Sequence, residues 1–184
     1  MKVNSILNSS AGQDLLAVAF KLGRAKALAQ IISRKVIPYN TKGFTFDPRL
    51  ERCLALGPNT NPAIFVVSMA GHEQKVPRIP TEGDLTWWIF ARLELLRSEG
   101  KYIGGWPYLG DYYLDISVLV RGRAAAMAFA VANGQRAVYH PASGGSEDVK
   151  PDEFDPPSPS VPVSRPRTPP PASPKEALCL GNSK

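Results

Sequence analysis

Residues 101–140 read KYIGGWPYLGDYYLDISVLVRGRAAAMAFAVANGQRAVYH, and this stretch decides the fold. Apolar and polar side chains alternate between residues 112 and 120, with one face formed by Tyr112, Leu114, Ile116, Val118 and Val120. Alternation with a period of two predicts a β-strand that packs on one face and is partly solvated on the other. Pro107 and Gly110-Asp111 are typical of a turn, so we expect a hairpin with a strand over residues 102–106.

A helix and a last strand are expected to follow. From residue 123 to residue 132 the chain holds only Ala, Met, Phe and Val apart from Arg123, and the alanines would let a helix lie close on a sheet. Asn133-Gly134 predicts the end of this helix, because glycine accepts the left-handed conformation of a C-cap. We expect residues 135–140 either to pair in parallel beside the 112–120 strand after a right-handed crossover or to form an edge.

The preceding part of the chain adds further elements. The apolar run 63–69 predicts a central strand, and Gly43–Pro48 predicts a short one. Thr81 with Asp84 fits a capping pattern for a helix that runs to about Ser98. The sequence therefore predicts an α+β domain over residues 43–142, with two packed helices and a small mixed or antiparallel sheet of about five strands. Its core is expected to include Trp106, Leu114, Ile116, Met127 and Val138.

Residues 1–42 carry the excess positive charge of the chain. They hold seven Lys and Arg against one acid, Asp14, whereas residues 43–140 hold ten against nine. Residues 10–36 predict an amphipathic helix that ends near Pro38, and we expect residues 1–42 to form a basic helical appendage to the domain. Three interpretations remain open for its basic side: a solvated face on a helix packed against the domain, a surface for nucleic acid or an anionic membrane, and a helix-pairing surface.

The C-terminal segment differs in composition. Eleven of the eighteen prolines lie between Pro141 and Pro174, mixed with Ser, Thr and acids. Such a segment does not bury enough apolar surface to offset its ordering entropy, so we expect residues 143–184 to be a disordered or polyproline-like tail that folding does not require. Its two bare PxxP cores lack a basic residue at the flanking position that orients an SH3 ligand, which favours a spacer over a docking motif.

Few residues indicate a catalytic or metal-binding role. Cys53 and Cys179 lie in unlike contexts, which favours a reducing, cytoplasmic location, and no apolar run approaches the roughly 18 residues of a membrane span. His72 beside Glu73 is expected to be a polar turn, and an enzyme would need Asp115, His72 and His140 to converge in a cleft. The sequence thus predicts no catalytic residues, no metal site and no cofactor.

Four segments carry a resemblance to other proteins: Gly43–Pro48, Gly104–Trp106, Tyr113–Ser117 and Asn133–Tyr139. Over residues 43–140, about half of the chain, the sequence resembles small α+β proteins of actinobacteria and their phages, for which no activity is assigned. The resemblance implies a tryptophan strand, a Leu-Asp-Val-Ser-like strand, a helix and an Asn-Gly-Gln strand. The acidic helix start of those proteins is replaced here by Arg121-Gly-Arg123, which makes this face more basic.

Two functional hypotheses follow. The first is a non-catalytic interaction or adaptor module, encoded by a phage or another mobile element, that binds a protein partner. The alternative is a nucleic-acid-binding protein that uses the basic N-terminal helix. The residues expected to bind the partner or the nucleic acid are Lys21, Arg24, Lys26, Arg34, Lys35, Arg121 and Arg123.

Overall fold

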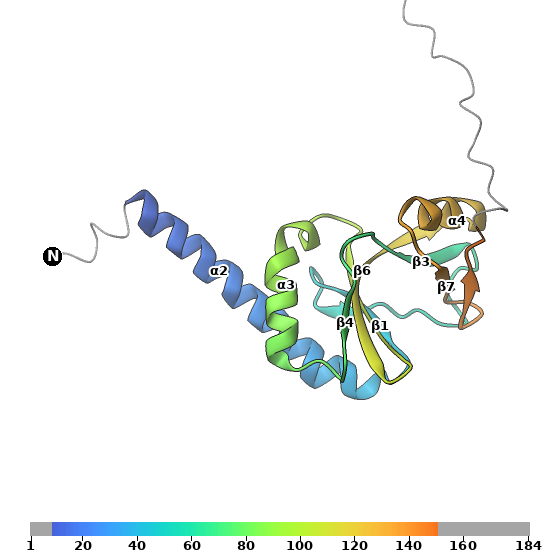
Figure 1. Cartoon of the computed structure of the whole chain (residues 1–184), viewed down its shortest axis with the longest axis horizontal. Helices are drawn as coiled ribbons and strands as arrows, with labels where there is room; N and C mark the ends of the chain where they lie inside the picture. The colour runs from blue at the N-terminus through green and yellow to red at the C-terminus, as the bar shows by residue number, and fades with distance from the viewer. Residues whose placement is uncertain (1–8, 151–184) are drawn as a thin grey trace, which may run out of the picture. The chain divides into compact units, whose positions relative to one another are not determined.

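The structure is a computed structural model that describes residues 9–150 (Figure 1). The part of the expected tail that follows residue 150 lies outside the described residues. The chain is an α+β protein in which an N-terminal helix precedes an antiparallel sheet.

The sheet has eight strands rather than about five. They are β1 (Phe44–Asp47), β2 (Arg52–Cys53), β3 (Ile64–Ser68), β4 (Gln74–Val76), β5 (Tyr102–Tyr108), β6 (Asp111–Arg121), β7 (Ala137–His140) and β8 (Gly145–Asp148). The strand order is β2-β1-β5-β6-β3-β7-β8, and β4 also pairs with β6. The additional strands are mostly two to four residues long, too short for a periodic pattern to reveal them.

Strand β6 is the centre of the sheet. Along one edge it pairs with β5 over the whole hairpin, from Tyr102 opposite Ser117 to Tyr108 opposite Asp111. Along its other edge β3 and β4 pair with it in succession. The hairpin turn is tighter than expected, because β5 continues through Pro107 and only Leu109 (φ 49°) and Gly110 (φ 85°) connect the strands.

The position of β7 corrects the sequence-based expectation. It pairs antiparallel with β3, which occupies the edge of β6 that a parallel β7 would need, so β7 does not lie beside β6. Nor is it an edge strand, because β8 pairs with its other side after a turn in which Gly144 has a φ of 69°. Residues 145–148 therefore belong to the domain, and the expected boundary at residue 143 is too early.

Within residues 9–150 three α-helices accompany the sheet: α2 (Ser10–Ile31), α3 (Glu82–Leu96) and α4 (Arg123–Ala132). Ser9 caps α2 through its side chain, which accepts a hydrogen bond from Gly12 N at 3.1 Å. A π-helical turn, η1 (Ile32–Val36), and a 3₁₀ turn, η2 (Ile37–Tyr39), complete the first helical segment. Helix α3 has the expected cap at Thr81, which forms a capping box with Asp84.

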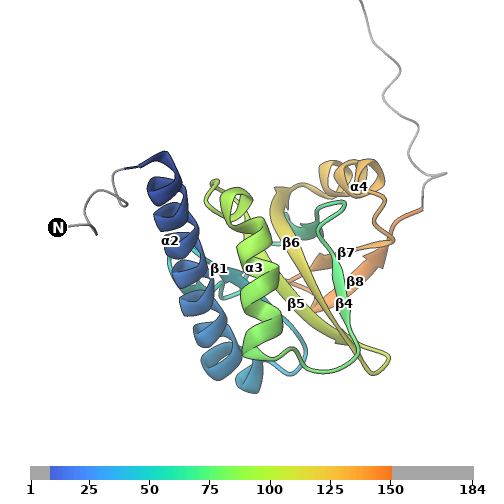
Figure 2. The same cartoon turned by 60° about the vertical axis from the view of Figure 1, so that its left-hand side comes forward.

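Two hydrophobic clusters hold these helices to the sheet. In the larger cluster, residues of α2, η1 and α3 pack against Ile103, Leu114 and Ile116, and α2 and α3 lie side by side (Figure 2). In the smaller one, α4 packs on Phe65, Val67 and Val118. Ala25, Leu28, Ala29, Ile32 and Val36 all belong to the larger cluster. The N-terminal helix is thus part of the core rather than an appendage that precedes the domain.

The position of Trp106 also differs from the expectation. Leu114, Ile116, Met127 and Val138 are buried as expected, but Trp106 is only half-buried. The hairpin register sets Trp106 directly opposite Tyr113. Directly opposed residues share one face of a sheet, so Trp106 lies on the face away from Leu114.

The two faces of β6 should respond differently to truncation. Leu114→Ala removes a side chain that is 0% exposed, so it should cost roughly 2–5 kcal/mol of unfolding free energy. Leu119→Ala is the matched control, because this half-buried leucine lies on the other face of the same strand. Equal costs for the two variants in urea denaturation would contradict the register.

A substitution at Tyr112 should not lower the stability of the domain. Its hydroxyl is buried without a hydrogen-bond partner among the described residues, and burial raises the pKa of Tyr112 to about 12. Tyr112→Phe removes this unsatisfied group and should leave stability unchanged or raise it by about 1 kcal/mol. A loss of that size in urea denaturation would show instead that the hydroxyl has a partner.

Candidate interaction surface on helix α2

The N-terminal half of α2 is the most exposed apolar part of the described chain. Leu15 is 69% exposed, Val18 50% and Phe20 77%, and Leu16 and Leu22 are exposed as well. Figure 1 shows that these first turns of α2 extend past α3, away from the sheet. We call residues 10–23 the α2 arm.

The arm is exposed because its neighbouring helix is shorter. Helices α2 and α3 run antiparallel, since Arg34 pairs with Glu82 at the start of α3 and Lys21 pairs with Glu94 near its end. Helix α3 stops at Leu96, two residues beyond Glu94. The turns of α2 that precede Lys21 lie past this contact and diverge from α3 (Figure 1).

One face of the arm continues the buried face of α2. Positions spaced alternately by four and three residues run along a single helix face. Here they form a seam, which consists of Ala11, Leu15, Val18, Leu22, Ala25, Ala29, Ile32 and Val36. The last four are buried in the core and the first four are exposed. The same stripe is therefore a core surface in one half of α2 and a free surface in the other.

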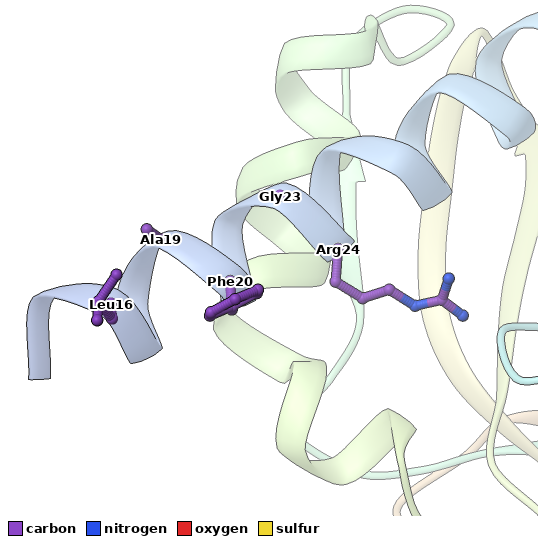
Figure 3. Close-up of a pocket in the computed structure, with 5 residues that line it drawn as sticks. All are labelled: Leu16, Ala19, Phe20, Gly23 and Arg24. Carbon is purple, nitrogen blue, oxygen red and sulfur yellow. The ribbon is translucent and has the colours of Figure 1, made fainter. Parts of the chain in front are cut away.

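A second apolar face lies beside this seam. Leu16, Ala19, Phe20, Gly23 and Arg24 line a shallow hollow along successive turns of α2 (Figure 3). An adjoining hollow shares Phe20 and Arg24 and reaches the end of α3, with the further lining residues Leu28, Pro48, Arg49, Leu93, Leu96 and Arg97. The arm is thus apolar on more than one side.

The basic residues expected to form a binding surface are not gathered in one patch. Lys21 pairs with Glu94 at 3.6 Å and lies over the Phe90 ring, and Arg34 pairs with Glu82 at 3.1 Å. Arg24 pairs with Glu51 and donates to the Pro48 carbonyl at 2.7 Å. These three side chains already contact groups of their own domain.

The remaining four expected residues are dispersed. Lys26 and Lys35 are exposed on α2 and η1. Arg121 and Arg123 lie where β6 meets α4, away from α2 (Figure 1). Arg123 also pairs with Glu147 of β8 at 2.7 Å. The structure therefore does not bring Arg121 and Arg123 together with the basic residues of α2.

Asp115 has a structural explanation. It is 2% exposed, and its carboxylate accepts hydrogen bonds from Ser68 Oγ at 2.8 Å, Ser117 Oγ at 2.5 Å and Trp106 Nε1 at 3.1 Å. Gly104 lies opposite, where a Cβ atom would fall 2.1 Å from Asp115 Oδ1. The Gly-Gly-Trp and Leu-Asp-Ile-Ser segments thus form one polar network across two strands.

The residues that an enzyme would need do not converge. His140 stacks on Phe65 at 4.7 Å, on the face that α4 covers, whereas Asp115 is on the opposite face. Partial burial and, second to it, the charge of Asp115 raise the pKa of Glu73, whereas the charge of Arg136 lowers it. Within residues 9–150, no group of three or more side chains is arranged to hold a metal ion.

None of the helices in this part of the chain combines the length and the apolarity needed to cross a membrane. No protein-family model, no curated protein and no solved structure matches the chain.

The Asp115 network predicts a specific loss of stability. An ionised carboxylate only accepts hydrogen bonds, which suits the three donors around it, whereas the amide of Asp115→Asn would direct an N–H group at one of them. We expect this variant to cost roughly 2 kcal/mol in chemical denaturation. Asp111→Asn on the same strand removes only the exposed pair with Lys75 and should cost less than about 1 kcal/mol. Similar costs for both variants would mean that the network contributes little.

Proposed function

We propose that this protein is a non-catalytic interaction module that binds a protein partner through the α2 arm. The observation that carries the proposal is the exposure of five large apolar side chains on a helix segment that extends past its own domain. Large apolar patches on a protein surface commonly mark sites of protein interaction.

The chemistry of the arm supports a protein partner. A helix that is apolar on several sides is normally buried, and covering its side chains gains roughly 25 cal/mol for each Å² removed from water. A helix presents such anchors to a groove or to another helix at spacings of three and four residues, which Leu15, Val18 and Leu22 have. We further propose, from the sequence resemblance, that the module is encoded by a phage or another mobile element and acts in the cytoplasm.

Nucleic-acid binding remains the alternative hypothesis. Its support is the basic composition of residues 1–42, but Lys21, Arg24 and Arg34 would have to exchange carboxylate partners for phosphates. Neutralising phosphates releases counterions, so duplex affinity would fall with salt by about 0.9 log units per log unit of salt for each contact. This steep dependence distinguishes nucleic-acid binding from docking through apolar side chains.

The proposal predicts which substitutions abolish association. A tagged chain should capture a protein from a nuclease-treated host extract, either a different protein or an untagged copy of itself. The double variant Leu15→Gln and Phe20→Gln should capture no protein, because the substitutions make one residue on each apolar face of the arm polar. Both side chains are mostly exposed, so the stability of the domain should change by less than about 0.5 kcal/mol.

Leu109→Gln is the matched control, since Leu109 is also exposed but lies in the β5–β6 turn. It should capture as much partner as the unmodified chain. Capture that survives the double substitution, or that disappears with nuclease and depends steeply on salt, would overturn the proposal.

A further inference from the structure

The exposed half of the α2 seam has the layout of a helix-pairing surface. Ala11, Leu15, Val18 and Leu22 are separated by four, three and four residues, and all four are exposed. Two helices pack side by side at a small crossing angle through stripes with this spacing. Because the buried part of the same stripe already packs within the domain, the arm presents its exposed part to a second helix.

This seam is complementary to itself when two copies run antiparallel. In that arrangement Leu15 of one copy lies against Val18 of the other, and Ala11 lies against Leu22. The two-fold axis repeats both contacts, so the interface consists of four layers of paired side chains. Every exposed seam position is used, and Ala25, which is buried in the domain, is not needed.

The charges beside the seam match in the same register. Asp14 and Lys21 flank it on one side, and the antiparallel arrangement sets Asp14 of each copy against Lys21 of the other. In the dimer, Asp14 of the second copy joins or replaces Glu94 as the partner of Lys21. Asp14 is the only acid in residues 1–42 and is exposed. On the opposite flank Ala19 is small and exposed, which allows the two helices to approach closely.

We infer that the partner of the α2 arm is a second copy of this chain, bound by antiparallel pairing of the two arms; this inference rests on the proposed function. The pair of oppositely charged contacts fixes the direction and register. Four layers make a small interface of the kind that associates weakly and reversibly, so the dimer dissociates on dilution. Leu16 and Phe20 lie off the seam and stay on the outside.

Sedimentation velocity of the purified full chain over a wide concentration range tests the dimer. The mass should rise from 20.0 kDa toward twice that value as concentration increases. Val18→Gln places a polar group in the two central layers and should leave the chain monomeric. Phe20→Gln, on the same arm but off the seam, should dimerise like the unmodified chain.

Charge reversal tests the direction of the arms. Asp14→Lys and Lys21→Glu each set like charges against each other twice in a homodimer, so each variant alone should dimerise about tenfold more weakly at low salt. Mixing the two variants restores opposite charges at both contacts, so a heterodimer of near-normal affinity should form. A parallel pairing, or contact through another surface, would give no such rescue.

A chain that stays monomeric at every concentration overturns the inference, as does a dimer that Val18→Gln leaves intact or that mixing fails to restore. The proposed function is distinguished by the extract experiment. If the purified chain is monomeric but captures a different protein through the arm, only the inference of a second copy fails. If it also captures nothing, the interaction function fails with it.

Discussion

The register of β6 is the constraint on which the rest of the structure depends. On one edge β6 pairs with β5 over residues 111–117, and on the other edge it pairs with β4 over residues 112–114 and with β3 over residues 117–121. This register directs Leu114 and Ile116 toward α2 and α3 and Val118 toward α4, so that one face of a single strand contributes to both hydrophobic clusters. It also places Asp115 beside Ser117 and opposite Gly104 on the other face. A shift of one residue would exchange these faces and bury a carboxylate under the helices.

The features that sequence patterns predict are local ones. The strand from Tyr112 to Val120, the Thr81 cap and the end of α4 at Asn133 depend on neighbouring residues, and each appears in the structure as expected. The second face of that strand differs, because Asp115 and Ser117 are buried rather than solvated. Pairing between distant segments carries no such signal. Nothing local indicates that β3 would separate β6 from β7, or that Gly145–Asp148, which is poor in β-forming side chains, would pair with β7. The aromatic character of Trp106 suggests that it is buried in the core, but the hairpin register decides which face of the sheet it occupies.

The candidate surface shows the same division between local and distant information. The sequence predicts the amphipathic helix and its stripe, but burial of that stripe depends on the length of the helix beside it. Helices α2 and η1 together run from Ser10 to Val36, whereas α3 has only fifteen residues. This difference in length was the available signal for an exposed arm. The basic residues were the more conspicuous feature of the sequence, yet Lys21, Arg24 and Arg34 contact carboxylates within the domain.

The π-helical turn at Ile32–Val36 follows α2, which includes the arm, and precedes η2 and β1. A π turn accommodates one residue more than an α-helical turn, and such turns often occur at functional sites. Since each residue of an α-helix turns the chain by about 100°, the loss of one residue between Ile32 and Val36 would rotate all preceding side chains about the helix axis by that angle. The buried half of α2 belongs to the same helix, so that rotation would also turn Ala25, Leu28 and Ala29 out of the core. The core contacts of these residues therefore fix the direction in which the arm presents its seam.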